Sequence, residues 1–232
     1  MSVLIITYIH DGIVMASDSR ATASPRTPDD KSTIFISDAY SSILLTPSQL
    51  GIAFAGENGI DGVPIEIFLR PFVTKHCSNV KAAPEEVANQ LLKFLPKLRP
   101  SQLVRFFVAG YRNGTEQQIW YVDPVESAIG RVDANGRPGV HYSGECDVVE
   151  RIASSVGVLD TDGRLLRTLP FFPVAAGAFA LQDAVDFSVF LVRAQIDAVR
   201  FQQRPKTVGG PIDVLAIQPD KTCWVQRKQV HA

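Results

Sequence analysis

A serine directly behind the initiator methionine is the first residue whose position could do chemistry. Removal of Met1 would leave Ser2 with a free α-amine beside its own hydroxyl group. An α-amine has an unperturbed pKa of about 7.7–8.0, so part of it is unprotonated near neutral pH. A hydroxyl with such a base beside it is an activated nucleophile that needs no histidine. Ser2 is therefore a candidate nucleophile; the alternative is a residue that merely permits removal of Met1.

Two apolar runs follow Ser2 and are expected to form a β-hairpin. The runs cover Val3–Ile9 and residues 13–16, and an Asp11-Gly12 pair between them favours a tight turn. The second strand leads into the polar string Asp18-Ser19-Arg20-Ala21-Thr22. Because hairpin strands pair antiparallel, this polar string is predicted to return to the neighbourhood of Ser2.

This opening pattern resembles that of the proteasome β-subunit family of N-terminal nucleophile hydrolases. The match is ungapped: Ser2 stands at the position of the family's threonine and Asp18 at that of its aspartate. The resemblance implies a four-layer αββα sandwich and cleavage of peptide bonds by Ser2. It also implies a homo-oligomeric ring around the active sites, peptide or unfolded protein as substrate, and an ATPase as a partner to consider.

Two further positions match the family at shorter motifs. Gly56 corresponds to a glycine whose backbone N–H stabilises the tetrahedral oxyanion, although it could also be a turn glycine at a strand end. Ser143 corresponds to a hydroxyl near the nucleophile's amine, although a serine before a helix is also a good N-cap. Phe54 falls at the floor of the family's first specificity pocket, with a core phenylalanine as the default interpretation.

The cation that the family places beside its nucleophile is missing at the expected position. The resemblance implies that Asp18 holds a lysine there, but that lysine aligns with Ser41 or Ser42. Lys31, in a polar loop, is the candidate replacement, with a solvated loop residue as the alternative. Arg20 could also approach Asp18, but an arginine cannot shuttle protons. Without such a role, Asp18 would cap a turn or pair with Arg20 on the surface.

Two outer partners are also replaced, which keeps other functions open. Pro205 stands where the family has an aspartate, and Val208 where it has a serine. The first expectation remains a peptidase that uses Ser2. A non-catalytic assembly subunit with a degenerate site is the second, and an N-terminal nucleophile amidohydrolase of small amides is the third, because fold does not fix function.

Hydrophobic periodicity predicts an α+β chain whose elements form one domain over residues 1–232. The order strands, helices, strands, helices, strands suits two sheets packed face to face with helices outside. A polar, proline-rich loop is expected at residues 24–31. Further strands are predicted at residues 42–45, 51–55, 103–109, 118–122, 128–132, 139–142, 212–217 and 223–226, and helices at residues 60–76, 84–98, 145–156 and 181–201.

Composition excludes several classes of protein and site. A formal net charge of −1 shows no excess of basic residues that would favour nucleic-acid binding. The apolar runs are too short to cross a bilayer. Cys77, Cys146 and Cys223 are expected to be reduced thiols, which together with the lack of a signal-peptide pattern points to a cytoplasmic protein. The histidines and cysteines lack ligand spacing, and residues 160–163 indicate a turn rather than a calcium loop, so no metal or cofactor is expected.

Overall fold

Two five-stranded antiparallel sheets form the centre of the protein. The computed structural model describes residues 2–23, 34–60, 62–78, 82–98 and 104–229. The first sheet has the order β12 (Gly139–Gly144), β1 (Val3–Ile9), β2 (Gly12–Asp18), β15 (Ile212–Ile217) and β16 (Thr222–Gln226). The second has the order β11 (Ala128–Arg131), β10 (Glu116–Asp123), β9 (Arg105–Arg112), β6 (Gly51–Ala55) and β5 (Ile43–Leu45).

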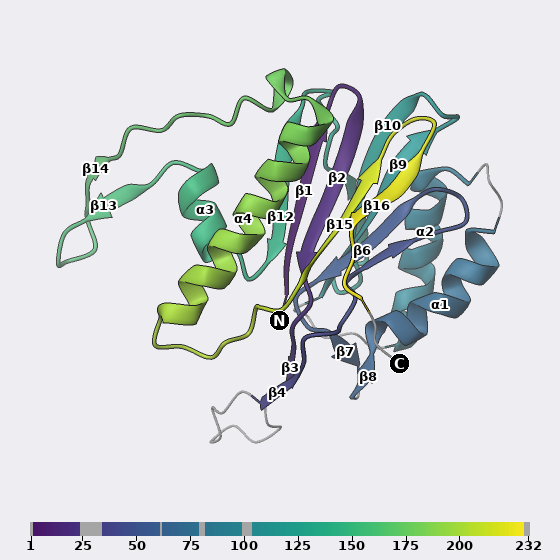
Figure 1. Cartoon of the computed structure of the whole chain (residues 1–232), viewed down its shortest axis with the longest axis horizontal. Coiled ribbons are helices and arrows are strands. Elements are labelled where there is room, and N and C mark those ends of the chain that lie inside the picture. Colours follow the sequence, from purple (N-terminus) through teal and green to yellow (C-terminus); the bar gives the residue numbers. More distant parts are fainter. Residues whose placement is uncertain (1, 24–33, 61, 79–81, 99–103, 230–232) are drawn as a thin grey trace.

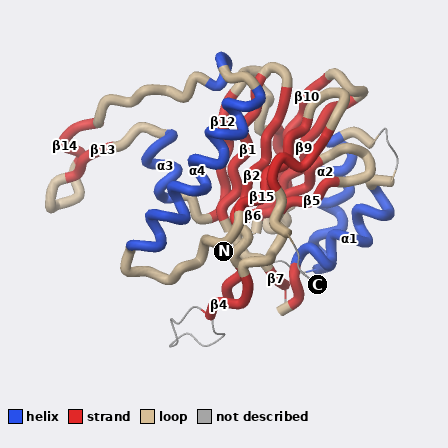
Figure 2. The backbone as a smooth tube through the Cα atoms, viewed as in Figure 1, coloured by secondary structure: helices blue, strands red, loops and turns tan. Residues whose placement is uncertain are grey.

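Four α-helices lie on the outer sides of these sheets (Figures 1 and 2). Helices α3 (Asp147–Ala153) and α4 (Leu181–Phe201) lie beside the first sheet, and α1 (Ile65–His76) and α2 (Pro84–Phe94) beside the second. Two 3₁₀ turns cover Leu95–Leu98 and Ala176–Ala178. The chain is therefore a mixed α+β protein, as its periodicity predicts.

Alternation of side chains along β1 divides the apolar residues between two cores. Leu4 and Ile6 pack with Phe107 of β9 in the core between the sheets. Val3 and Ile5 point the other way and pack with residues of α4. Since successive side chains of a strand point to opposite faces, one fully buried strand serves both cores. The start of β1 is thereby fixed from both sides.

The first hairpin and the last long helix are confirmed, whereas the predicted helix over residues 60–76 begins too early. A small hairpin of β7 (Gly59–Ile60) and β8 (Val63–Pro64) occupies its first residues, and α1 starts at Ile65. A residue before proline is pushed out of the helical region, so Pro64 holds Val63 extended. Pro64 itself is extended, with ψ of 133° at the N-cap position. The predicted helix over residues 145–156 is likewise shorter, at Asp147–Ala153.

Two further short strand pairs were not predicted. Strand β3 (Ala21–Ala23) pairs with β4 (Ile34–Ser37), and β13 (Gly157–Leu159) pairs with β14 (Leu165–Thr168) in a hairpin that projects from the body (Figure 1). The turn predicted between β13 and β14 is present, with Asp160 Oδ1 accepting from the backbone N–H of Asp162 and Arg164. No helix in the described part of the chain is long and apolar enough to cross a membrane.

Candidate active site

Ser2 lies where the two sheets meet at one end of the molecule. Its backbone N–H donates to the carbonyl oxygen of Gly56 at 3.0 Å, and its own carbonyl accepts from Glu145 N–H at 3.0 Å. The residue is fully buried. Its Oγ atom has no hydrogen-bond partner among the described residues, which is unusual because buried hydroxyls are nearly always paired. An exception of this kind calls for a functional or structural explanation.

Asp18 is buried beside the first residues of β1. Its Oδ1 accepts from Val3 N–H at 3.0 Å, and its Oδ2 accepts from Gly209 N–H at 2.8 Å and from Arg20 N–H at 3.4 Å. Burial raises the pKa of this carboxyl to about 7, and the three backbone hydrogen bonds oppose that rise. The interpretation as a surface residue is wrong, because Asp18 joins three chain segments in the interior.

Gly56 forms a bridge with Ser2, and Ser143 pairs with Leu4, two residues farther along β1. Gly56 follows β6 and has a φ of 105°, a backbone conformation that favours glycine. Ser143 pairs with Leu4 across β12 and β1, so it shares the face of the sheet that Leu4 occupies. Its N-cap interpretation is wrong: the α3 N-cap is Cys146, and Ser143 lies within β12.

The turn out of β12 is fitted closely to the Ser2 backbone. Gly144 has a φ of 91°, and a Cβ atom added there would lie 1.9 Å from the carbonyl oxygen of Ser2. Four of the five predicted site residues, Ser2, Asp18, Gly56 and Ser143, therefore come together at one end of the sheets. The fifth, Lys31, lies outside the described residues.

The positions aligned with the family lysine serve the second sheet. Ser42 is buried, and its carbonyl accepts from Phe54 N–H at 3.0 Å just before β5. Phe54 is fully buried and packs edge-on against Tyr40 in the core between the second sheet and its helices. The interpretation of Phe54 as a core residue is thereby confirmed.

The Arg20 guanidinium forms its ion pair with Asp38. Its Nε and Nη2 atoms donate to the two oxygens of Asp38 at 2.7 and 2.8 Å. The side chain passes over Gly209, where an added Cβ would lie 2.5 Å from the guanidinium carbon. The absence of a side chain at Gly209 thus lets Arg20 cross while the Gly209 N–H reaches Asp18.

A buried lysine that the sequence did not single out lies close to the end of β2. Lys228 Nζ donates to the Asp213 carboxylate and, at 3.2 Å, to Ser19 Oγ. The Lys228 side chain is 5% exposed and that of Asp213 is 2% exposed. Lys228 follows β16 and is separated from Ser19 by 209 positions, so no local sequence signal connects them.

The loop before β15 is fixed by a second polar network. Thr207 Oγ1 donates to Glu145, and Arg204 forms an ion pair with the same carboxylate at 3.5 Å. Val208, at the position of the family's serine, is buried in the core beside α4. This network orients the segment that supplies the Gly209 N–H to Asp18, which is the only function for Thr207 that the described contacts indicate.

Asn58 is a further residue that sequence reasoning missed. Its Nδ2 donates to the carbonyl of Arg20 at 2.8 Å, which fixes the orientation of the amide. The side-chain oxygen is buried and has no partner within the described ranges. Asn58 stands two positions after Gly56, so this end of the sheets holds two buried oxygens without partners, Asn58 Oδ1 and Ser2 Oγ.

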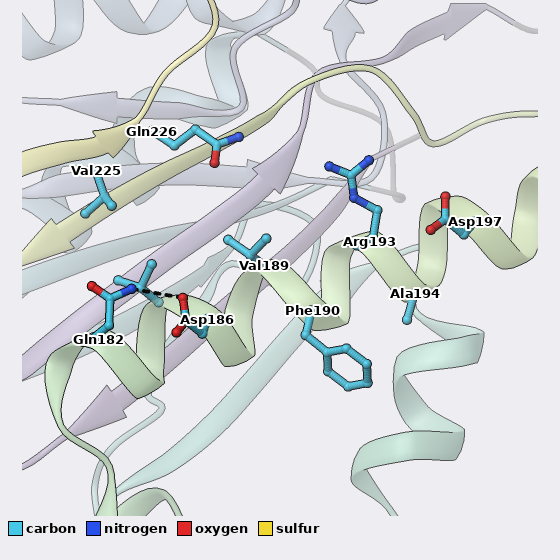
Figure 3. Close-up of a pocket in the computed structure, with 10 residues that line it drawn as sticks. Gln182, Asp186, Val189, Phe190, Arg193, Ala194, Asp197, Val225 and Gln226 are labelled. Atoms are coloured by element: carbon cyan, nitrogen blue, oxygen red, sulfur yellow. Dashed lines mark hydrogen bonds between the residues drawn. The ribbon is translucent and has the colours of Figure 1, made fainter.

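A separate cavity of about 590 Å³ lies between α4 and the edge strand β16 (Figure 3). Side chains of α4, among them Asp186, Phe190 and Arg193, line it together with Val225 and Gln226 of β16. None of the four described candidate residues lines this cavity. The described residues contain no cluster of three or more His, Cys, Asp or Glu that could hold a metal ion, and Cys77, Cys146 and Cys223 are free thiols.

Comparison with known proteins adds no further assignment. No family model matches the chain. No curated protein matches it at a significant level either. The functional argument therefore depends on the geometry around Ser2 and on the residues that carry the proteasome-like pattern.

Proposed function

We propose that the chain is a proteasome-like peptidase that cleaves peptide bonds with Ser2 as an N-terminal nucleophile. The observation that carries this proposal is the buried Ser2 Oγ, which lacks a partner in the described part of the chain. The backbone N–H of Ser2 bonds to Gly56, and that of the next residue, Val3, bonds to Asp18. The hydroxyl of a buried structural serine normally forms a hydrogen bond, as that of Ser17 does with the Val3 carbonyl. The Ser2 hydroxyl is therefore available to react with a substrate.

The proposal includes the four-layer αββα arrangement of N-terminal nucleophile hydrolases. Its support is the set of three separate apolar cores: one between the sheets, one between the first sheet and α3 and α4, and one between the second sheet and α1 and α2. The antiparallel order of both sheets and the position of β1 at the centre of this packing agree with it.

The reaction requires removal of Met1, which converts the Ser2 backbone nitrogen into an α-amine. This amine takes the proton of the Ser2 hydroxyl while Oγ bonds to the carbonyl carbon of the substrate. The tetrahedral intermediate then breaks its C–N bond, and the leaving amine receives the proton from the α-ammonium. Water next adds to the resulting ester, giving its proton to the α-amine, and Oγ recovers a proton as the ester bond breaks.

The surrounding residues have distinct parts in this mechanism. The Gly56 N–H is the donor for the oxyanion, because the residue has no side chain to hinder a close carbonyl. Asp18 holds the Val3 N–H and the Gly209 N–H and so fixes the backbone that carries Ser2. Ser143, on the same face as Leu4, supplies a hydroxyl for the α-amine.

A second function, a non-catalytic assembly subunit, is favoured by one observation. Ser2 has no exposed surface in the chain that retains Met1. Exposed apolar side chains near and within the β13–β14 hairpin offer a surface for assembly, whether as a homo-oligomeric ring or with another partner: Leu159, Leu165, Leu166, Phe171 and Phe172. An amidohydrolase of small amides would use the same Ser2 chemistry on a shorter substrate.

The deciding experiment combines intact mass with a probe that needs both reactive groups. A peptide epoxyketone closes a ring with a hydroxyl and an adjacent α-amine, so it reports an N-terminal nucleophile directly. We expect loss of Met1 and a single adduct that maps to Ser2. Retention of Met1 would overturn the peptidase and the amidohydrolase together, and processed protein that stays unlabelled would favour the assembly subunit. Turnover of an extended peptide but not of a small amide separates the two enzymes.

A further inference from the structure

The Lys228–Asp213 ion pair is buried and has no part in the mechanism given above. Lys228 Nζ binds the Asp213 carboxylate and donates to Ser19 Oγ at 3.2 Å, while its backbone N–H donates to Asp213 Oδ1 at 2.9 Å. Both side chains are at most 5% exposed. Charged groups are seldom buried in this way without a structural or functional reason.

Strand register places this pair close to the nucleophile. Leu4 pairs with Ser17, and Ser17 pairs with Asp213 on the other side of β2. Continuing the β1–β2 register by two residues sets Ser2 opposite Ser19. Residues opposite each other in an antiparallel pair point to the same face, with Cβ atoms about 4.5–5.5 Å apart. Ser19 is therefore the residue beyond β2 that this extended register brings toward Ser2, and its hydroxyl contacts the Lys228 ammonium.

The segment that carries Lys228 also runs beside the position where the family lysine is missing. Arg227 and Ser41 line the same cavity of about 220 Å³. The side chain of Lys228, the residue after Arg227, is buried, and so is Ser42, the residue after Ser41. Lys228 thus brings a positive charge from the far end of the chain, on a segment that lines one cavity together with Ser41.

We propose that Lys228 is a positioning residue for Ser2, acting through the Ser19 hydroxyl; this inference rests on the function proposed above. Because Ser19 Oγ accepts from Lys228, its own O–H remains available as a donor. Its proposed acceptor in the processed protein is the Ser2 hydroxyl, which has no partner among the described residues while Met1 is present. The ammonium also favours the deprotonated forms of nearby groups, so it lowers the pKa of the Ser2 α-amine. Asp213 holds the ammonium in place.

Epoxyketone labelling at Ser2 tests this inference in variants of the processed protein. The double variant Lys228→Met with Asp213→Asn removes both charges together and leaves neither one unpaired. We expect its labelling rate constant to fall by about 10² or more, the usual scale for a group that assists proton transfer. The pKa on the acidic limb of the rate profile should rise toward about 7.7–8.0. Lys228→Arg should restore part of the rate and lower that pKa again.

Lys221→Met serves as the matched control, since Lys221 is an exposed lysine in the turn before β16. It should label at the wild-type rate. If the double variant fails to fold, Ser19→Ala leaves the ion pair intact and should still lower the rate at least tenfold.

The outcomes separate this inference from the function on which it rests. Suppose that the wild type is labelled at Ser2 and that the double variant has the same rate and pH profile. This result would overturn the role of Lys228 and leave the proposed peptidase function intact. The same conclusion would follow from an unchanged Ser19→Ala variant if the double variant does not fold. A wild-type protein that has lost Met1 but is not labelled would overturn both.

Discussion

Ser2 donates its backbone N–H to the carbonyl oxygen of Gly56 at 3.0 Å and thereby joins the first strand of one sheet to the end of a strand in the other. The same residue accepts from Glu145 N–H on its other side. Its backbone is therefore fixed by both neighbours, while its hydroxyl is left without a partner within the described ranges. A rigid backbone with an uncommitted hydroxyl is the arrangement that a preorganised nucleophile needs.

Replacing Ser2 by alanine should separate function from stability. We expect Ser2→Ala to abolish epoxyketone labelling while the free energy of unfolding in urea changes by no more than about 0.5 kcal/mol, because the lost Oγ makes no hydrogen bond with described residues. Ser17→Ala is the control: it loses a 2.8 Å bond to the Val3 carbonyl and should lower the free energy of unfolding by about 1 kcal/mol. A large loss of stability in Ser2→Ala would mean that Ser2 is structural.

A side chain at Gly144 should disturb the backbone of the nucleophile. Gly144 has a φ of 91°, and an added Cβ would lie 1.9 Å from the Ser2 carbonyl oxygen. We expect Gly144→Ala to destabilise the fold by more than about 3 kcal/mol and to abolish labelling, because backbone strain and a collision add together.

Gly136→Ala provides a comparison with backbone strain alone. Gly136 has a φ of 63° and nothing within 4 Å of an added Cβ, so its substitution should cost only about 1 kcal/mol and leave labelling intact. Equal effects of the two substitutions would contradict the close fit between Gly144 and Ser2.

Asp18 should make the stability of the protein depend on pH. Its pKa is raised to about 7 in the native state, above the ordinary value of 3.8, mainly by burial. Between these two values the native carboxyl keeps a proton that the unfolded chain releases. The free energy of unfolding of the wild type, relative to Asp18→Asn, should therefore fall as the pH rises from 4 to 7, by at most ~1.4 kcal/mol per pH unit.

Urea unfolding of both proteins across this pH range measures the difference. A constant difference would show that the Asp18 carboxyl has the same pKa in both states. A rising difference would show that the backbone donors from Val3 and Gly209 outweigh burial.

Much of the fold could be predicted because the signals are local. Alternating apolar residues around an Asp-Gly turn specified the β1–β2 hairpin, and a broad apolar face specified α4 over Leu181–Phe201. The early start assigned to α1 came from counting apolar residues without the effect of Pro64 on Val63. Strands of two to four residues carry too few apolar positions for periodicity to detect, which explains the missed β3–β4, β7–β8 and β13–β14 pairs.

Only those residues of the candidate site that lie within recognisable sequence motifs could be predicted. Ser2, Asp18 and Gly56 lie in segments that resemble the proteasome pattern, and the structure places them together. Lys228 could not be found in this way, because its contact with Ser19 spans 209 positions and depends on how β16 ends. A search limited to lysines near Asp18 in sequence led to Lys31 instead.

The cysteines should be irrelevant to activity. Burial raises the pKa of Cys77 to about 11 and that of Cys146 to about 12, so few thiolates form at pH 8. We expect iodoacetamide to modify the partly exposed Cys223 well before the other two, as read by peptide mass spectrometry. Epoxyketone labelling of Ser2 should survive this treatment. Its loss would point to a cysteine-dependent reaction.

The Lys228–Asp213 pair should show strong coupling in a double-mutant cycle. Lys228→Met alone leaves the Asp213 carboxylate buried without its partner, and we expect a loss of about 3–5 kcal/mol in the free energy of unfolding. Adding Asp213→Asn removes the remaining charge and should recover most of that loss, since the backbone N–H at position 228 can still donate to the amide oxygen. Additive effects in urea unfolding would mean that the two side chains do not interact, and Ser19 would then lack the fixed cation that its contact with Lys228 indicates.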